Sequence, residues 1–145
     1  MQLPVALGVL AGLVALSGAL GLVLRRSAGR VRATPADARR VVQPHELGDG
    51  IRFGSAATLV QFSTAICASC PATRRLLGEL AKAAGVAHVD VDVTDNLDLA
   101  ARFGILQTPT TLLLDGAGRQ VARIGGPPRR IELQHQLAIL TSSPA

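Results

Sequence analysis

The chain has 145 residues, a formal net charge of +5 and 48% hydrophobic residues, which is enough for one ordinary domain and an additional segment. Its two cysteines are too few for the disulfide scaffold of a small secreted protein. Because the chain contains no Trp or Tyr and three Phe, we expect a core built from Leu, Val, Ile and Ala.

The additional segment is an apolar run at the N-terminus, residues 3–24, which carries no charged residue. As a helix it would be about 33 Å long, and the hydrocarbon core of a bilayer is roughly 30 Å thick. A cleaved signal peptide is the alternative, but it usually has a basic start and a shorter apolar core. Here the start is uncharged and Arg25 and Arg26 follow the run directly. We therefore predict one transmembrane helix over residues 1–25.

The positive charge is concentrated directly after this run. Asp37 is the one acidic residue before position 41, and the basic residues there are Arg25, Arg26, Arg30, Arg32, Arg39 and Arg40. The rest of the chain holds equal numbers of basic and acidic residues, which argues against a nucleic-acid-binding face. We predict a basic juxtamembrane linker over residues 26–44, where each arginine near anionic lipid contributes about 1 kcal/mol.

The charge asymmetry also predicts the orientation of the chain. Positive residues flank the C-terminal side of the apolar run and none flanks its N-terminal side, so the positive-inside rule places the following domain in the cytoplasm. The expected location is thus the cell membrane, crossed once, with the domain on the cytoplasmic side. An extracytoplasmic domain remains the alternative.

The pattern from residue 58 onward predicts alternating strands and helices. A buried strand is expected at 58–63, and a second strand with strict alternation at 86–93. Between them Pro71 suits the first turn of a helix and Gly85 suits its end.

The second half of the domain follows the same alternation. Asp95 is suited to cap a short helix that ends at Gly104. Strands at 110–114 and 120–124 are expected to form a hairpin, and a last helix covers 129–140. This order predicts an α/β domain with a mixed sheet flanked by helices.

The domain is expected over residues 45–145, with four to five strands in its sheet. The strand that is needed to complete five is expected at 51–53, where the pattern is weak.

Cys67 and Cys70 lie between the first of these strands and its helix, and three explanations are open. A zinc site needs three or four ligands, but His45, His88 and His135 are isolated from the pair and from one another. Two inert core thiols need no such spacing. A redox pair has a mechanism: backbone N–H groups at a helix N-terminus favour a thiolate at Cys67, and Cys70, one turn on, can resolve a mixed disulfide.

From about residue 58 to residue 140 the chain resembles thioredoxin. The motifs that carry this resemblance are Cys67-Ala68-Ser69-Cys70 with its strand and helix, the segment 103–110, and Gly125. The resemblance implies a thioredoxin-like fold, with no metal or organic cofactor beyond the redox-active disulfide. It also implies that Pro109 follows a cis peptide bond beside the cysteines.

By the same resemblance, Thr108 offers backbone hydrogen bonds to an extended substrate segment. Ile66, Ala68 and Gly125 would line the docking groove with Pro109. Cys67 would attack the substrate and Cys70 would resolve the intermediate.

The sequence departs from the usual pattern of the family at several positions. Ile66 replaces the usual tryptophan, and Ala68-Ser69 replaces Gly-Pro. Gln61 stands where thioredoxins carry a buried aspartate that helps to deprotonate the resolving thiol, and Asp90 stands where many carry a lysine. Because glutamine does not titrate, we expect release of the mixed disulfide to be slow.

These inferences predict a membrane-anchored thiol–disulfide oxidoreductase that exchanges disulfides with protein substrates, membrane-bound ones included, as a monomer and without nucleic acid. Two alternatives stay open. One is an extracytoplasmic reductant for cytochrome maturation or secreted disulfides. The other is a redox-silent docking module that uses the groove for binding.

Overall fold

The structure is a computed structural model that describes residues 2–142. Residue 1 of the predicted membrane helix and residues 143–145 of the predicted domain lie outside this range. The helices are α1 (Gln2–Ser27), α2 (Cys70–Ala84), α3 (Leu97–Arg102) and α4 (Arg130–Ser142), with short 3₁₀ turns at Ala36–Ala38 and Pro44–Glu46. The strands are β1 (Arg32–Ala33), β2 (Ala57–Ser63), β3 (Ala87–Asp92), β4 (Thr110–Asp115) and β5 (Gln120–Gly125).

The five strands form one mixed sheet in the order β1-β5-β4-β2-β3. β2 and β3 are parallel and every other neighbouring pair is antiparallel. β2 lies between β4 and β3, and all of its residues are buried. This confirms the predicted mixed sheet and the prediction that the strand at 58–63 is buried on both faces.

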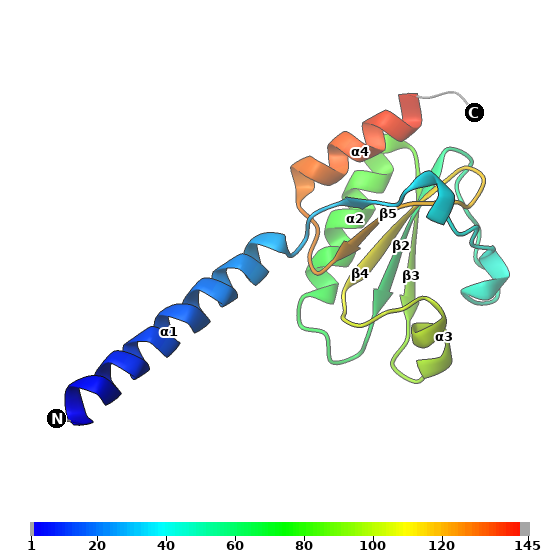
Figure 1. The fold of residues 1–145 in the computed structure, drawn as a ribbon. Helices are drawn as coiled ribbons and strands as arrows, with labels where there is room; N and C mark the ends of the chain where they lie inside the picture. Colours follow the sequence, from blue (N-terminus) through cyan, green and yellow to red (C-terminus); the bar gives the residue numbers. More distant parts are fainter. Residues whose placement is uncertain (1, 143–145) are drawn as a thin grey trace.

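Helices cover both faces of the sheet (Figure 1). On one face Leu59 and Leu113 pack with Leu77 of α2 and Leu133 of α4. On the other face Val60 and Phe62 of β2 and Leu112 of β4 pack with Phe103, which follows α3. Because side chains alternate along a strand, Gln61 shares the face of Leu59 and lies under α2. That position places a polar side chain directly behind the cysteine pair.

The predicted strand at 51–53 is wrong. Ile51 and Phe53 lie in an irregular segment and pack their side chains against the core beside Phe62, so their backbone does not pair. The fifth strand is β1, within the segment 26–44 that we predicted as a linker. Arg32 and Ala33 pair with β5, and the short length of this strand explains why no sequence pattern marked it.

The predicted helix cap at Asp95 is also wrong by one position. Asn96 caps α3, because its Oδ1 accepts the Leu99 N–H at 3.0 Å. Other predicted ends agree with the structure: Pro71 lies in the first turn of α2, and Gly85 ends that helix with a left-handed φ of 67°. The left-handed conformation suits glycine because it lacks a Cβ.

α1 projects away from the domain, and its C-terminal end lies beside the sheet (Figure 1). Residues 4–27 are long and apolar enough to cross a membrane, and none of the apolar window is buried against the domain. A signal sequence near an N-terminus has the same properties. α1 thus meets the criteria of a membrane anchor or of a signal sequence.

Candidate functional site

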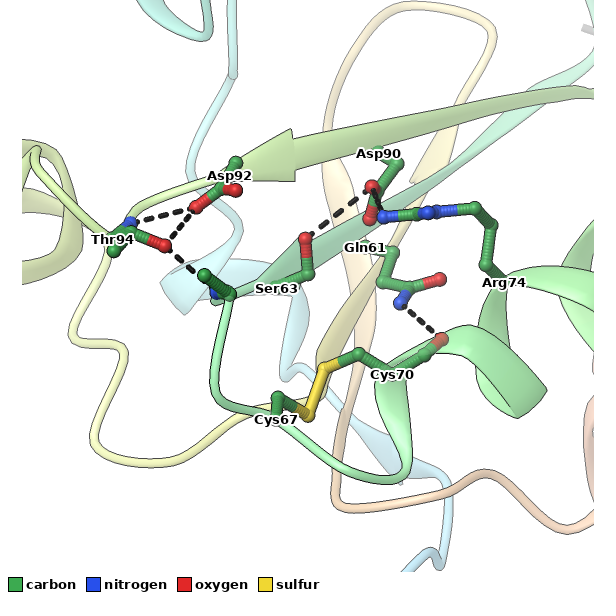
Figure 2. Close-up of polar contacts among 9 residues, drawn as sticks. Gln61, Ser63, Cys67, Cys70, Arg74, Asp90, Asp92 and Thr94 are labelled. Atoms are coloured by element: carbon green, nitrogen blue, oxygen red, sulfur yellow. Dashed lines mark hydrogen bonds and ion pairs between the residues drawn. A yellow bond between two sulfur atoms is a disulfide. The ribbon is translucent and has the colours of Figure 1, made fainter.

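Cys67 lies in the loop between β2 and α2, Cys70 begins α2, and their sulfurs form a disulfide (Figure 2). Their Cα atoms are 5.4 Å apart. Cys70 is the first residue of α2 and is only 2% exposed, whereas Cys67 lies before the helix and is half-buried. The Cys70 N–H donates to the Cys67 carbonyl at 3.2 Å. The more accessible sulfur is therefore at the helix N-terminus, where the helix dipole favours a thiolate.

The loop before β4 approaches the disulfide segment from the neighbouring strand. The peptide bond between Thr108 and Pro109 is cis, as the resemblance implied. The hydroxyl oxygens of Thr64 and Thr108 are 3.1 Å apart and share a hydrogen bond, and the Gly126 N–H donates to the Pro109 carbonyl at 2.8 Å. Thr64 lies three residues before Cys67, so this bond joins the cysteine loop to the proline loop.

The surface around these two loops is apolar and exposed. Ile66 is 93% exposed next to Cys67, and Ala68 is exposed as well. Leu106, which the sequence analysis did not single out, is 95% exposed two residues before Thr108. Leu106 could have been identified from the sequence, because it is a large apolar residue three residues before Pro109. Both loops therefore expose apolar side chains that a bound protein could cover.

Gly125 ends β5 beside the proline loop. It pairs with Thr110 of β4, and a Cβ at this position would lie 2.4 Å from Nε2 of Gln107. The backbone here is therefore approached closely by the loop that carries Thr108. Of the residues predicted to line a groove, the structure places Ile66 and Ala68 on the cysteine loop and Thr108, Pro109 and Gly125 at the adjoining strand ends.

A buried polar group lies behind Cys70. Gln61 is fully buried, and its Nε2 donates to the Cys70 carbonyl at 3.1 Å. On β3, Asp90 lies in register with Gln61. Its Oδ2 accepts from the Ser63 hydroxyl at 3.3 Å and forms an ion pair with Arg74 of α2 (Figure 2). Gln61 thus fixes the first turn of α2 by its amide, and the carboxylate sits one strand away.

Several polar atoms of this group have no protein partner among residues 2–142. They are Oε1 of Gln61, Oδ1 of Asp90 and the hydroxyls of Thr73 and Thr111. Thr111 lies opposite Gln61 on β4, so the group extends across three strands. Buried polar atoms are nearly always hydrogen-bonded, which makes this region behind the disulfide suited to internal water.

The cysteine loop is also tied to the end of β3. The Ala65 N–H donates to the Thr94 hydroxyl oxygen at 2.8 Å, and Asp92 accepts from the backbone N–H of Thr94 (Figure 2). Hydrogen bonds from the Thr94 side chain and backbone lower the pKa of Asp92. Thr94 is a further residue that the sequence did not reveal, because a single threonine in a turn is not part of a recognisable motif.

His88 points toward the same helix-covered face as Asp90, two residues along β3. Burial lowers the pKa of His88 from the ordinary value of 6.5; the nearby Asp90 opposes this shift and Arg74 adds to it. Because the unfolded chain binds the proton at higher pH than the folded chain, the contribution of His88 to stability is present above pH 6.5 and lost as the pH falls through its folded pKa.

We therefore expect His88→Gln to flatten the pH dependence of stability on the acidic side. Wild type should lose free energy of unfolding between pH 7 and pH 5, and the variant should lose less, as measured by urea unfolding followed by circular dichroism. His135→Gln is the control, since His135 is exposed on α4. Equal slopes for wild type and His88→Gln would contradict the assignment.

The three histidines do not gather with the cysteines. His45 lies in the 3₁₀ turn before β2, His88 on β3 and His135 on α4. Among the residues that the structure describes, no three His, Cys, Asp or Glu side chains are grouped to hold a metal ion.

The chain is similar to a known protein family. The family model for thioredoxin matches residues 40–138, more than half of the chain. No curated protein sequence matches the chain significantly.

Solved structures of thioredoxins are similar to the domain. A point mutant of thioredoxin from Halobacterium salinarum is 24% identical, covering 63% of this chain and 80% of its own, with a TM-score of 0.56. Thioredoxin-2 of the malaria parasite, described as a component of its protein secretion machinery, is 21% identical over 69% of this chain and 99% of its own, with a TM-score of 0.54. A thioredoxin from Nicotiana alata is 29% identical over 59% and 73%, with a TM-score of 0.50.

The matches to the family model and to these structures confirm the predicted thioredoxin-like fold and support a thiol–disulfide exchange activity in general terms. With a cysteine pair at the start of α2 and a cis-proline loop beside it, the chain belongs to the thioredoxin family.

Proposed function

We propose that the protein is a membrane-anchored thiol–disulfide oxidoreductase that exchanges disulfides with protein substrates. The observation that carries this proposal is the disulfide between Cys67 and Cys70 at the start of α2, hydrogen-bonded through Thr64 to the loop of Thr108 and Pro109. The accessible sulfur of Cys67 suits the attacking role and the buried sulfur of Cys70 suits the resolving role, while the exposed Ile66 and Leu106 offer contacts to a protein substrate.

The exchange runs in two steps that conserve electrons. In the reduced protein the Cys67 thiolate attacks one sulfur of a substrate disulfide, forming a mixed disulfide and releasing one substrate thiolate. Cys70 then loses its proton and attacks Sγ of Cys67, which restores the disulfide and releases the second substrate thiol. The substrate gains two electrons and two protons and the protein loses them. The same steps in reverse oxidise a dithiol, and the disulfide itself is the only redox group needed.

The remaining site residues would bind the substrate chain. The backbone of Thr108 is suited to pair with an extended segment, because the pairing of β4 begins only at Thr110 and Thr108 lies beside the cysteine loop. Ile66 and Ala68 would contact the segment on the cysteine side, and the backbone of Gly125 would contact it on the other side.

Membrane attachment completes the proposal. α1 would be retained as the anchor, and the arginines that follow it would lie near anionic lipid. The charge asymmetry favours a cytoplasmic domain, with the extracytoplasmic orientation as the alternative. Tethering confines the site to partners at the membrane and raises its effective concentration there.

The proposal is tested by reduction of insulin with the full chain in detergent and dithiothreitol as electron donor. We expect catalysed reduction, which disappears when the reduced protein is first alkylated with iodoacetamide. Equal rates with native and alkylated protein would contradict the proposal and favour the redox-silent docking module. Reporters fused to the C-terminus distinguish the two membrane orientations.

Gln61 is expected to limit the second step. Replacing it with aspartate places a titratable carboxylate where the amide now holds the Cys70 carbonyl, and a general base contributes roughly 10²-fold or more when well placed. Because Asp90 is adjacent and like charges oppose each other, we expect a smaller gain for Gln61→Asp, about tenfold in the rate of mixed-disulfide release at pH 8.

Stopped-flow measurement of single turnovers with Gln61→Asp checks this expectation. Gln61→Asn is the matched control, because it has the same length as aspartate but no titratable group. If both variants release the substrate at the same rate, the carboxylate has no effect at this position.

A further inference from the structure

The geometry points to a substrate class: disulfides that membrane proteins carry close to the bilayer surface. This inference rests on the proposed function, including the retention of α1 as an anchor. It goes further because the structure fixes where the redox site lies relative to the end of α1.

The first observation is a seat for the end of α1 on the domain, formed by the hydrogen bonds of Gly29 and Arg129. Gly29, two residues after the helix, is buried and donates its N–H to the Gly125 carbonyl at 2.9 Å. The Gly29 carbonyl accepts the N–H of Arg129 at 3.2 Å, and the Arg129 guanidinium donates to the Arg26 carbonyl at 2.6 Å. A Cβ on Gly29 would lie 2.2 Å from the Pro127 carbonyl oxygen, and its φ is +72°. The seat is therefore built for glycine.

The second observation is that this seat and the substrate groove share a residue. Gly125 accepts the hydrogen bond from Gly29 and pairs with Thr110, the residue after the cis-proline. The next residue, Gly126, donates to the Pro109 carbonyl at 2.8 Å. A continuous set of hydrogen bonds thus leads from the end of the anchor to the proline loop.

These contacts bound the distance from the end of α1 to the proline loop. Two residues from Ser27 to Gly29 span at most about 7 Å, and two steps between hydrogen-bonded backbones and one residue along β4 add about 13 Å. The proline loop therefore lies within about 20 Å of the end of α1, whereas a domain of this size is roughly 30 Å across. In Figure 1 α1 runs from the domain toward the lower left, the loop between β2 and α2 lies at the lower end of the domain, and α4 ends at the opposite, upper end.

The third observation is an open space between the end of α1 and Gly125, one of the proposed groove residues. A cavity of about 430 Å³ separates the last turn of α1 from Gln107 and Gly125, and its other lining residues include Arg30, Arg32 and Arg123. A chain segment that rises from a neighbouring membrane span can enter this space next to Gln107 and Gly125, beside the proline loop. Disulfides far above the bilayer would face the opposite, redox-inactive end of the domain.

The test uses the full chain in liposomes with a fluorogenic disulfide peptide as the probe. The peptide is attached to lipid through polyproline spacers of three or sixteen residues, which extend about 3.1 Å per residue and stay stiff. A third, unattached copy of the peptide reports intrinsic activity. We expect the short-spacer substrate to be reduced at least tenfold faster than the long-spacer one.

Gly29→Ala should break the contacts of the seat, because the new Cβ clashes with the Pro127 carbonyl oxygen. The ratio of the short-spacer rate to the long-spacer rate should then fall toward one, with the rate on the unattached peptide unchanged. Gly50→Ala is the matched control, because Gly50 has a similar φ of +74° but its Cβ would meet nothing within 4 Å. A flexible Gly-Ser insertion of twenty residues after Ser27 frees the domain without altering any of its residues and should give the same loss of preference.

The outcomes separate the two proposals. Equal rates on both spacers by a protein that reduces the unattached peptide would overturn this inference and leave the proposed exchange activity standing. If both Gly29→Ala and the insertion variant still reduce the short-spacer substrate faster, the seat does not position the redox site and this inference is wrong. No activity on the unattached peptide, or removal of the protein from liposomes by carbonate, would overturn the proposed function and the inference with it.

Discussion

Replacing Cys70 with serine should convert the protein into a trap that attacks a substrate once and holds it. Cys67 keeps its place before the helix N-terminus and its exposure, so formation of the mixed disulfide is retained. The second step is lost because serine cannot displace a disulfide sulfur. Intramolecular groups act with very large effective concentrations, so we expect steady-state turnover to fall by roughly 100-fold or more.

Mass spectrometry of the variant after one exposure to a disulfide peptide should show one peptide bound per chain. Cys67→Ser is the control and should capture nothing, since the remaining sulfur at position 70 is only 2% exposed. Capture by Cys67→Ser in place of Cys70→Ser would show that the assigned roles are reversed.

Phe62→Ala should cost the domain about 3–5 kcal/mol in its free energy of unfolding. Phe62 is fully buried on β2, one residue from Gln61, and its ring centroid lies 5.3 Å from that of Phe103. Removing it leaves a cavity beneath α3 and breaks the one aromatic pair that joins β2 to this helix-covered face among residues 2–142. Domains of this size are stable by about 5–15 kcal/mol, so the variant would be marginally folded.

The loss is measured as a shift of the urea midpoint by far-ultraviolet circular dichroism, because the chain has no Trp or Tyr for intrinsic fluorescence. Ile66→Ala truncates an apolar side chain at the surface, where Ile66 is 93% exposed, and should change stability by about 0.5 kcal/mol or less. A loss below about 1 kcal/mol for Phe62→Ala would mean that the core relaxes around the missing ring.

The sequence predicted the parts of the fold that are periodic. The strands at 58–63 and 86–93, the hairpin and the ends of α2 at Pro71 and Gly85 all agree with the structure, because alternation, proline and glycine report local geometry. It failed at β1, since Arg32 and Ala33 owe their strand conformation to pairing with β5 and not to their own propensity.

The candidate site was predictable as a set of residues and not as a set of contacts. The spacing of Cys67 and Cys70 and the proline segment were sufficient to expect a disulfide beside Pro109. The ion pair of Asp90 with Arg74, and the hydrogen bond between Thr64 and Thr108, join residues that lie far apart in the chain. Contacts of this kind depend on strand register and helix placement, which one sequence does not specify.

The two edge strands of the sheet affect how copies of the protein behave when they crowd on a membrane. One edge strand, β1, is two residues long, and the other, β3, carries two aspartates in six residues. Short length and charge both discourage a strand from recruiting another chain. Neither edge strand is both long and uncharged, so we do not expect densely packed anchored copies to form intermolecular β-sheets.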